Sequence, residues 1–219
     1  MLKFHHAPWS RGSGVLWLLE ELGVPYEMIH EDIRREGGAS ESYRTIQPNK
    51  KVPAIEHDGI VVTERAAITI YLAEAFESAG LNVPPGDADR ARFLTWCVYS
   101  DSVFDPCVAA RAHGYSYKSN DFSFGLFEDM VANLERHLKA HDFAAGRRFS
   151  AADTQLASAV AFTMNVLNVL PKLPAFEAYL ARIAERPAYL RAQKIDYDLA
   201  MTTPYFQAQM GLGTAPVDG

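Results

Sequence analysis

The segment from Lys51 to Arg65 places the strongest constraint on the fold of this chain. It contains two short apolar stretches of the β type, separated by Asp58-Gly59, a dipeptide that tolerates the positive φ angles of a tight hairpin turn. Proline cannot donate a hydrogen bond to a neighbouring strand, so Pro53 is expected at the start of the first strand. Val52, just before it, is therefore expected to leave its backbone N–H and C=O open to a partner outside the sheet.

A helical pattern at residues 64–77 follows this hairpin. Thr63 is predicted as the N-cap of that helix. The free backbone N–H groups of Glu64, Arg65 and Ala66 then form an anion site at the helix N-terminus. An open strand edge beside an anion site suits a small peptide that carries a free carboxylate.

Composition argues against several classes of function. The 219 residues include 21 basic and 27 acidic side chains, for a net charge of −6. Nucleic-acid binding needs a concentrated basic face, and the basic pairs Arg34-Arg35 and Arg147-Arg148 are isolated. The N-terminus lacks the apolar core of a secretory signal, and no apolar run is long enough to span a bilayer. We therefore expect a cytoplasmic protein that binds neither nucleic acid nor membrane.

The cysteines and histidines indicate neither a disulfide framework nor a metal site. Cys97 and Cys107 both fall in helical patterns, which fits buried thiols in a reducing compartment. His5 and His6 are adjacent on a predicted strand and so point to opposite faces, and no Cys or carboxylate cluster has the spacing of metal ligands. We expect no metal.

The N-terminal third alternates between strand and helix patterns. Residues 2–5 and residues 26–30 both alternate like short strands. Between them, residues 15–22 form a helical apolar face that ends at Gly23. This βαβ unit predicts parallel strands with a right-handed crossover. A weak helical signal follows at residues 40–46.

A proline- and glycine-rich run at residues 79–86 marks a change in composition. Everything after it has helical character. We therefore predict an N-terminal α/β domain at residues 1–78, a linker at residues 79–87 and an all-helical C-terminal domain at residues 88–219.

The helices of that C-terminal domain can be placed from their apolar periodicity. They are expected at residues 87–104 with a disturbance at Pro106, and at 121–140, 150–170, 173–185 and 188–193. Ser150 with Asp153 three residues later is close to a capping box at the start of the third of these helices. The tail after Tyr197 is expected to fray.

Four motifs in this order resemble the glutathione transferase family, and the match covers nearly the whole chain. The motifs are residues 15–27 (VLWLLEELGVPYE), 47–55 (QPNKKVPAI), 63–72 (TERAAITIYL) and 149–153 (FSAAD). The resemblance implies a thioredoxin-like N-terminal domain, an all-helical C-terminal domain and a homodimer. Two positions depart from the family pattern: Arg65 stands where members usually have serine, and Lys50 replaces a commonly small residue.

The resemblance also implies a site for glutathione, the co-substrate of the family. Glutathione offers two carboxylates, an ammonium group, a peptide-like backbone and a thiol that is mostly protonated at neutral pH, since a free thiol titrates at about 8.5. By resemblance, the Val52-Pro53 bond is cis, and the backbone of Val52 pairs with the cysteinyl part of the tripeptide as an added strand would.

The two ends of glutathione have separate implied partners. Thr63, Glu64 and the N–H of Arg65 would hold the γ-glutamyl end, with Glu64 taking the ammonium. For the glycyl carboxylate, Lys51 is the nearest cation and Lys50 is a competitor.

A thiolate needs a hydrogen-bond donor near the end of the first strand. Ser10 matches the family position for members of the serine type, and its hydroxyl would stabilise the thiolate by donation. Arg11 is close enough in sequence to assist electrostatically, and Ser13 is the alternative donor. No cysteine lies in residues 8–11, which disfavours thioredoxin-style dithiol exchange.

Further residues have a functional and a structural interpretation. Asp101 could reach the γ-glutamyl ammonium of a neighbouring subunit, or lie on a solvated helix face. Trp9, Phe104, Tyr115 and Tyr117 could line an apolar substrate pocket, although core packing is the default for aromatic side chains.

These observations predict a glutathione transferase that acts in detoxification, conjugating the thiolate of glutathione to an electrophilic, mostly apolar substrate. Two alternatives stay open. The first is a glutathione-dependent isomerase or peroxidase, which uses the same thiolate. The second is a non-catalytic glutathione-binding or interaction module on the same fold.

Overall fold

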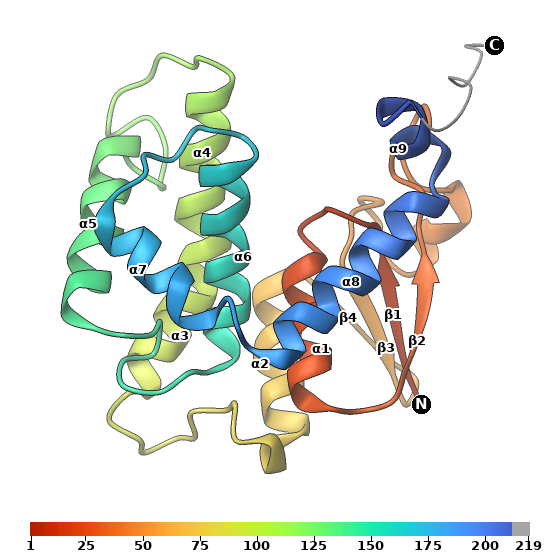
Figure 1. Ribbon diagram of the computed structural model, residues 1–219, viewed down its shortest axis with the longest axis horizontal. Coiled ribbons are helices and arrows are strands. Elements are labelled where there is room, and N and C mark those ends of the chain that lie inside the picture. Colours follow the sequence, from red (N-terminus) through yellow and green to blue (C-terminus); the bar gives the residue numbers. More distant parts are fainter. Residues whose placement is uncertain (212–219) are drawn as a thin grey trace. The chain divides into compact units, whose positions relative to one another are not determined.

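The computed structural model describes residues 1–211. The end of the predicted C-terminal tail, residues 212–219, lies outside the described residues. The described chain divides into two compact units, one formed by residues 1–68 with residues 187–211, the other by residues 69–186. This division differs from the domain boundaries expected from the sequence, which stay a prediction. The two units are coloured along the chain in Figure 1 and are described separately below.

The first unit is built on a four-stranded mixed sheet. Its strands are β1 (Leu2–His6), β2 (Tyr26–His30), β3 (Ala54–His57) and β4 (Ile60–Thr63), in the order β2-β1-β3-β4. β1 and β2 are parallel, while the β1–β3 and β3–β4 pairs are antiparallel. The predicted βαβ unit and hairpin are therefore confirmed, with Asp58 at φ 49° and Gly59 at φ 85° in the two-residue turn between β3 and β4.

Helix α1 (Ser13–Leu22) joins the two parallel strands, and its apolar residues are buried as the pattern predicts. It ends at Gly23, which adopts the left-handed conformation at φ 65° and donates its N–H to Leu19 O. The weak helical signal near residue 40 corresponds to a short 3₁₀ helix, η1 (Glu41–Thr45).

The start of the next helix differs from the prediction. α2 spans Arg65–Ala75, and the carbonyl of Glu64 accepts the first helical hydrogen bond, from Ile68 N at 2.9 Å. Thr63 is the last residue of β4 and pairs with Ala54 of β3. The prediction of Thr63 as N-cap is thus wrong by one residue, because the β3–β4 ladder extends further than the local pattern indicated.

The C-terminal segment of the first unit contains more helix than expected. α8 spans Pro187–Thr202 and α9 spans Pro204–Gln209, where a helix ending at residue 193 and a frayed tail were predicted. Figure 1 shows α8 running beside α1. The physical reason is tertiary: packing on α1 stabilises turns whose own sequence pattern is weak.

Two contacts fix α8 against α1. The ring of Tyr189 lies 4.8 Å from the ring of Trp17, centroid to centroid. Arg191 Nε donates to Glu20 Oε2 at 2.9 Å. The C-terminal helix is therefore a structural part of the unit that contains the sheet.

The second unit is helical, as predicted for the C-terminal domain. Its elements are η2 (Glu77–Ala79), α3 (Arg90–Tyr99), the π-helical turn η3 (Ser100–Phe104), α4 (Asp105–Ala112), α5 (Phe127–Ala140), α6 (Ala151–Asn165) and α7 (Pro174–Ile183). The predicted disturbance near Pro106 is real, since this proline lies in the first turn of α4. α5 begins at Phe127 rather than at residue 121. The predicted linker is packed within this unit, where Leu81 O accepts Ala151 N at 3.0 Å.

α6 starts with the predicted capping box. Asp153 accepts hydrogen bonds from Ser150 N at 2.8 Å and from Ala144 N at 2.7 Å, and Tyr179 Oη donates to it at 2.9 Å. Burial raises the pKa of the Asp153 carboxyl to about 6.

Cys97 and Cys107 are both buried, and neither is in a disulfide. Burial raises the pKa of the Cys107 thiol to about 11. The expectation of buried thiols is therefore confirmed.

His137 gives this unit a predictable pH dependence. Its Nε2 donates to Ala144 O at 3.0 Å, and burial together with the neighbouring His141 lowers the pKa of His137 to about 4. The folded state therefore binds fewer protons than the unfolded state, so stability is complete above about pH 6.5 and is lost as pH falls towards 4. Because His137 is partly exposed, we expect the stability lost over this pH range to be roughly 1–2 kcal/mol, which is less than the full pKa shift would give.

The measurement compares the free energies of unfolding of the wild type and His137→Gln, which keeps an N–H donor for Ala144 O. The stability advantage of the wild type should grow by that amount between pH 4 and pH 7. His141→Gln is the matched variant: it removes one charge that lowers the pKa of His137, so the pH dependence should shrink without vanishing. If the difference in free energy of unfolding between the wild type and His137→Gln does not change with pH, His137 is not the source of this pH dependence.

Candidate functional site

The residues predicted to bind glutathione come from three segments of the first unit. Ser10 and Arg11 follow β1, residues 51–53 precede β3, and residues 63–65 lie at and after the end of β4. The strand register brings these segments to one end of the sheet. His5 of β1 pairs with Ala54 of β3, and Ala54 pairs on its other side with Thr63 of β4. The sheet thus assembles, at one end, residues that are far apart in the sequence.

The bond between Val52 and Pro53 is cis, as the family resemblance implies. Pro53 is buried and directly precedes β3, and Val52 packs against a small cluster that includes Tyr43 and Ala54. Among residues 1–211, neither the N–H nor the C=O of Val52 forms a backbone hydrogen bond. Both groups are therefore available to a peptide that adds to this edge.

The two neighbouring lysines are in different situations. Lys50 Nζ bonds to Glu41 Oε1 at 2.6 Å, whereas Lys51 is exposed and makes no ion pair within the described part of the chain. The backbone of Lys51 is held on both sides, since its N–H donates to Gln47 Oε1 and its C=O accepts from Tyr43 Oη, each at 3.1 Å. Lys51 therefore has the more available ammonium group.

Gln47 is a residue that the sequence interpretation did not single out for a role. It is buried, and besides holding the N–H of Lys51 it places its Nε2 3.5 Å from Glu64 Oε1. One side chain therefore connects the segment before β3 to the start of α2. The signal in the sequence was only its place in the motif at residues 47–55, because a glutamine in a loop has no periodicity to mark it as buried.

The start of α2 presents backbone donors. Glu64 is exposed at φ 67° and acts as the N-cap, so the first amides of the helix are directed away from the helix body. Arg65 is only 5% exposed. Its backbone N–H, rather than its buried side chain, is therefore the group suited to meet a ligand carboxylate.

The hydroxyls of Ser10 and Ser13 are bound differently. Ser10 Oγ donates to Ala7 O at 2.7 Å and accepts from Gly12 N at 3.0 Å. Ser13 Oγ donates to a carboxylate oxygen, Asp196 Oδ2, at 2.5 Å. A hydrogen bond to an ionised acceptor is about twice as strong as one to a neutral acceptor. Ser10 can therefore redirect its proton to a thiolate at lower cost than Ser13 can.

Three residues in strained backbone conformations mark this end of the sheet. Trp9 has φ 52°, Lys50 has φ 55° and Glu64 has φ 67°, in the left-handed region that favours glycine. Such a conformation costs about 1–3 kcal/mol and persists where the surrounding structure enforces it. Trp9 precedes Ser10, Lys50 precedes Lys51, and Glu64 is itself a candidate site residue. Each strained residue is therefore part of the candidate site or adjacent to it in the sequence.

The two adjacent histidines point to opposite faces of β1, as predicted. His5 Nδ1 lies 2.9 Å from Glu31 Oε1, while His6 Nε2 lies 2.8 Å from Asp196 Oδ1. Among the described residues, no group of three or more Cys, His, Asp or Glu side chains is arranged to hold a metal ion.

The helical unit contains the other residues considered from the sequence. Phe104 is fully buried and belongs to the core, whereas Tyr115 is 65% exposed. Tyr115 and Tyr117 line a hollow of about 320 Å³ beside the start of α5. Asp101 accepts a hydrogen bond from Gln155 Nε2 at 2.8 Å, so it is held by the neighbouring helix rather than simply solvated.

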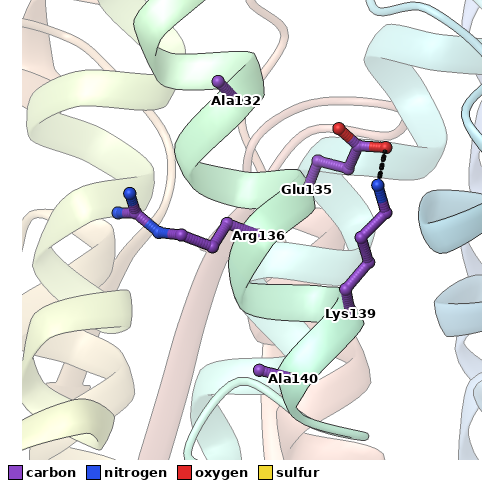
Figure 2. Close-up of a pocket in the computed structure, with 5 residues that line it drawn as sticks. All are labelled: Ala132, Glu135, Arg136, Lys139 and Ala140. Atoms are coloured by element: carbon purple, nitrogen blue, oxygen red, sulfur yellow. Dashed lines mark ion pairs between the residues drawn. The ribbon is translucent and has the colours of Figure 1, made fainter.

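A second hollow of about 380 Å³ lies on α5, lined by Ala132, Glu135, Arg136, Lys139 and Ala140. Figure 2 shows that all five side chains come from one helix and that Glu135 pairs with Lys139, while Arg136 points away from this pair. The groups in it form an i,i+4 ion pair typical of a helix surface. We assign no chemistry to it.

Both parts of the chain match models of a known protein family. Residues 1–74 match the family Glutathione S-transferase, N-terminal domain, and residues 123–187 match Glutathione S-transferase, C-terminal domain. A probable glutathione S-transferase of Nicotiana tabacum is 32% identical over 77% of this chain and 72% of its own length. The disulfide-bond oxidoreductase YfcG of Escherichia coli is 27% identical over 86% of this chain and 92% of its own length.

A solved structure has the same architecture. The chain superimposes on a sphingomonad glutathione S-transferase complexed with glutathione with a TM-score of 0.70 and 27% sequence identity, covering 89% of this chain and 98% of that one.

The sheet with its cis-proline segment and the helical unit define a two-part protein with a thioredoxin-like N-terminal domain and a helical C-terminal domain. The chain belongs to the glutathione S-transferase family. Within residues 1–211, no helix combines the length and the apolar character needed to cross a membrane.

Proposed function

We propose that this protein is a glutathione transferase that conjugates the thiolate of glutathione to an electrophilic, mostly apolar substrate. The observation that carries the proposal is the convergence of the three segments at one end of the sheet, set by the pairing of Ala54 with His5 and Thr63. In the reaction the sulfur attacks an electrophilic carbon and forms a C–S bond, the leaving group departs, and the thiol proton passes to solvent.

The tripeptide would be held along its whole length. The backbone of Val52 pairs with the cysteinyl unit, and Lys51 neutralises the glycyl carboxylate. At the other end Glu64 takes the ammonium, while Thr63 and the N–H of Arg65 bind the γ-glutamyl carboxylate at the N-terminus of α2. The open backbone groups of Val52 and the exposed ammonium of Lys51 support this orientation.

The thiolate would be stabilised by Ser10, with Arg11 adding positive potential. In the structure, Ser10 Oγ donates to the neutral carbonyl of Ala7. When the hydroxyl donates to a thiolate instead, a stronger, charge-assisted hydrogen bond replaces this one. Donation of this kind lowers the pKa of the bound thiol, which raises the fraction of nucleophile at neutral pH.

The test is an ultraviolet titration of the thiolate absorbance of glutathione bound to the purified protein. We expect the bound thiol to titrate at least one unit below the value of about 8.5 for a free thiol. A tightly bound glutathione whose thiol pKa is unchanged would overturn the transferase proposal and support a binding module. Absence of any binding would overturn both.

Gln47 should matter for binding rather than for chemistry. Gln47→Leu removes the acceptor of Lys51 N and the donor to Glu64 in one step. We expect the free energy of glutathione binding to weaken by about 1–2 kcal/mol. This loss raises KM for glutathione about 5- to 30-fold and leaves kcat nearly unchanged. Gln193→Leu, at an exposed position of α8, is the matched control and should leave both constants unchanged. A main effect on kcat would contradict this role.

The similarity to a disulfide-bond oxidoreductase favours one alternative, a reaction that uses glutathione as a reductant. The buried cysteines of this chain argue against a role of its own thiols in exchange. Steady-state turnover with an activated aryl halide, an organic hydroperoxide and a low-molecular-weight disulfide would separate conjugation from these reactions. The homodimer and a role in detoxification stay predictions from the family resemblance, and the cytoplasmic location stays a prediction from the sequence pattern.

A further inference from the structure

Helix α8 carries a buried carboxylate that contacts the segment around Ser10. Asp196 is 2% exposed. Its Oδ1 lies 2.8 Å from His6 Nε2 and 3.3 Å from Trp9 N, and its Oδ2 accepts the proton of Ser13 Oγ at 2.5 Å. These three contacts lie before and after Ser10 in the sequence. A single carboxylate thus holds both ends of the turn that presents the proposed thiolate donor.

The residue next to Ser10 needs such a restraint. Trp9 has φ 52°, which is uncommon for a bulky side chain and unfavourable by about 1–3 kcal/mol. Its backbone N–H points to Asp196, and its ring packs 6.4 Å from the ring of Tyr197 and 4.7 Å from that of Phe206. The segment that includes α8 and α9 therefore restrains Trp9 through both its backbone and its side chain.

His6 is held by the same carboxylate and lies beside the turn that contains Ser10. Its ring is fully buried and stacks on Phe4, with 4.9 Å between centroids. His6 Nδ1 has no hydrogen-bond partner among residues 1–211, so Asp196 is its polar anchor in the described structure. A Cβ on Gly12 would clash with His6 Nδ1 and lie 3.2 Å from Ser10 Oγ, which shows how closely the imidazole, Gly12 and Ser10 pack.

We propose that Asp196 is a positioning residue of the thiolate site. It acts through Trp9, His6 and Ser13 and makes no contact with the sulfur. It holds Trp9 in its strained conformation, and this conformation sets the direction of the Ser10 hydroxyl. This role rests on the proposed function, because it presupposes that glutathione binds with its sulfur at Ser10.

The test compares Asp196→Ala with Asp198→Ala. Asp198 lies on the same helix, is exposed and pairs with Lys194, so its loss should leave the site unchanged. For folded Asp196→Ala we expect the pKa of the bound glutathione thiol to rise by about one unit and kcat to fall about 10- to 100-fold. KM for glutathione should change less than about threefold, because the ends of the tripeptide bind elsewhere. A purely structural role would reduce the amount of folded protein without moving the thiol pKa.

Asp196→Asn tests whether Asp196 acts through its hydrogen bonds or through its negative charge. Its amide keeps an oxygen for Trp9 N and His6 Nε2, and its NH₂ can donate to Ser13 Oγ. We expect the pKa of the glutathione thiol bound to this variant to stay within about 0.3 of the wild-type value. A shift as large as that of Asp196→Ala would overturn positioning.

If Asp196→Ala does not fold, the double variant His6→Phe with Asp196→Leu replaces the buried polar pair by apolar groups, which is often neutral for stability. It still removes the acceptor of Trp9 N, so the thiol pKa should rise as before. An unchanged thiol pKa in this variant, beside a raised one in Ser10→Ala, would overturn the role of Asp196. An unshifted thiol in the wild type would instead contradict the proposed function.

Discussion

Ser10→Ala is expected to reduce kcat/KM for conjugation by about 100- to 1000-fold, the loss typical for removal of one preorganised donor from a developing anion. The same variant should raise the pKa of the bound thiol towards about 8.5. The physical reason is that no other hydroxyl in the turn has a proton as easily redirected, since Ser10 donates to the neutral carbonyl of Ala7. Steady-state kinetics and ultraviolet titration on the same preparation measure both effects.

Ser13→Ala is the matched control, because it removes the same group three positions further along. Its hydroxyl donates to Asp196 Oδ2, so its loss should cost at least about tenfold less than the loss of the Ser10 hydroxyl. Should Ser13→Ala prove the more damaging of the two, Ser13 would be the thiolate donor and Ser10 a turn residue.

The second large effect is on stability. Asp153→Ala should lower the free energy of unfolding by about 3–5 kcal/mol, the usual cost of removing one partner from a buried polar network. Asp153 is fully buried and accepts from Ala144 N, Ser150 N, Ser150 Oγ and Tyr179 Oη. Its removal leaves these donors without their acceptor and deletes the capping box of α6.

Urea denaturation at constant pH measures this loss. Asp142→Ala is the control in the same unit, since Asp142 is exposed and pairs with Arg182 at 3.2 Å. An exposed ion pair contributes at most about 1 kcal/mol. Similar losses for the two variants would show that the network around Asp153 is not a main source of stability.

The sequence was most informative where structure is encoded locally. The Asp58-Gly59 turn, the helix ending at Gly23 and the capping box at Ser150 and Asp153 were all predicted and are all present. Each depends on the φ preference or the hydrogen-bonding capacity of residues close together in the chain. The parallel pairing of the first two strands followed in the same way from one short βαβ unit.

Predictions from local sequence patterns were wrong or incomplete where contacts between distant segments determine the structure. Thr63 was predicted to cap α2, but its pairing with Ala54 keeps it in the sheet and shifts the cap to Glu64. From the sequence, Lys51 was the preferred cation for the glycyl carboxylate and Lys50 was a competitor. The ion pair of Lys50 with Glu41, which only the folded chain shows, distinguishes the two.

Residue patterns alone were enough to identify the family, the βαβ unit and the hairpin followed by helices, and the three segments that carry the candidate site. The folded chain was needed to show how those segments are held. Gln47 joins two of them, and Asp196, more than 180 residues after Ser10, supports the third from a helix whose length was underestimated. A buried glutamine or aspartate has no periodicity that marks it, because its role depends on packing and hydrogen bonds between elements that meet only in the folded chain.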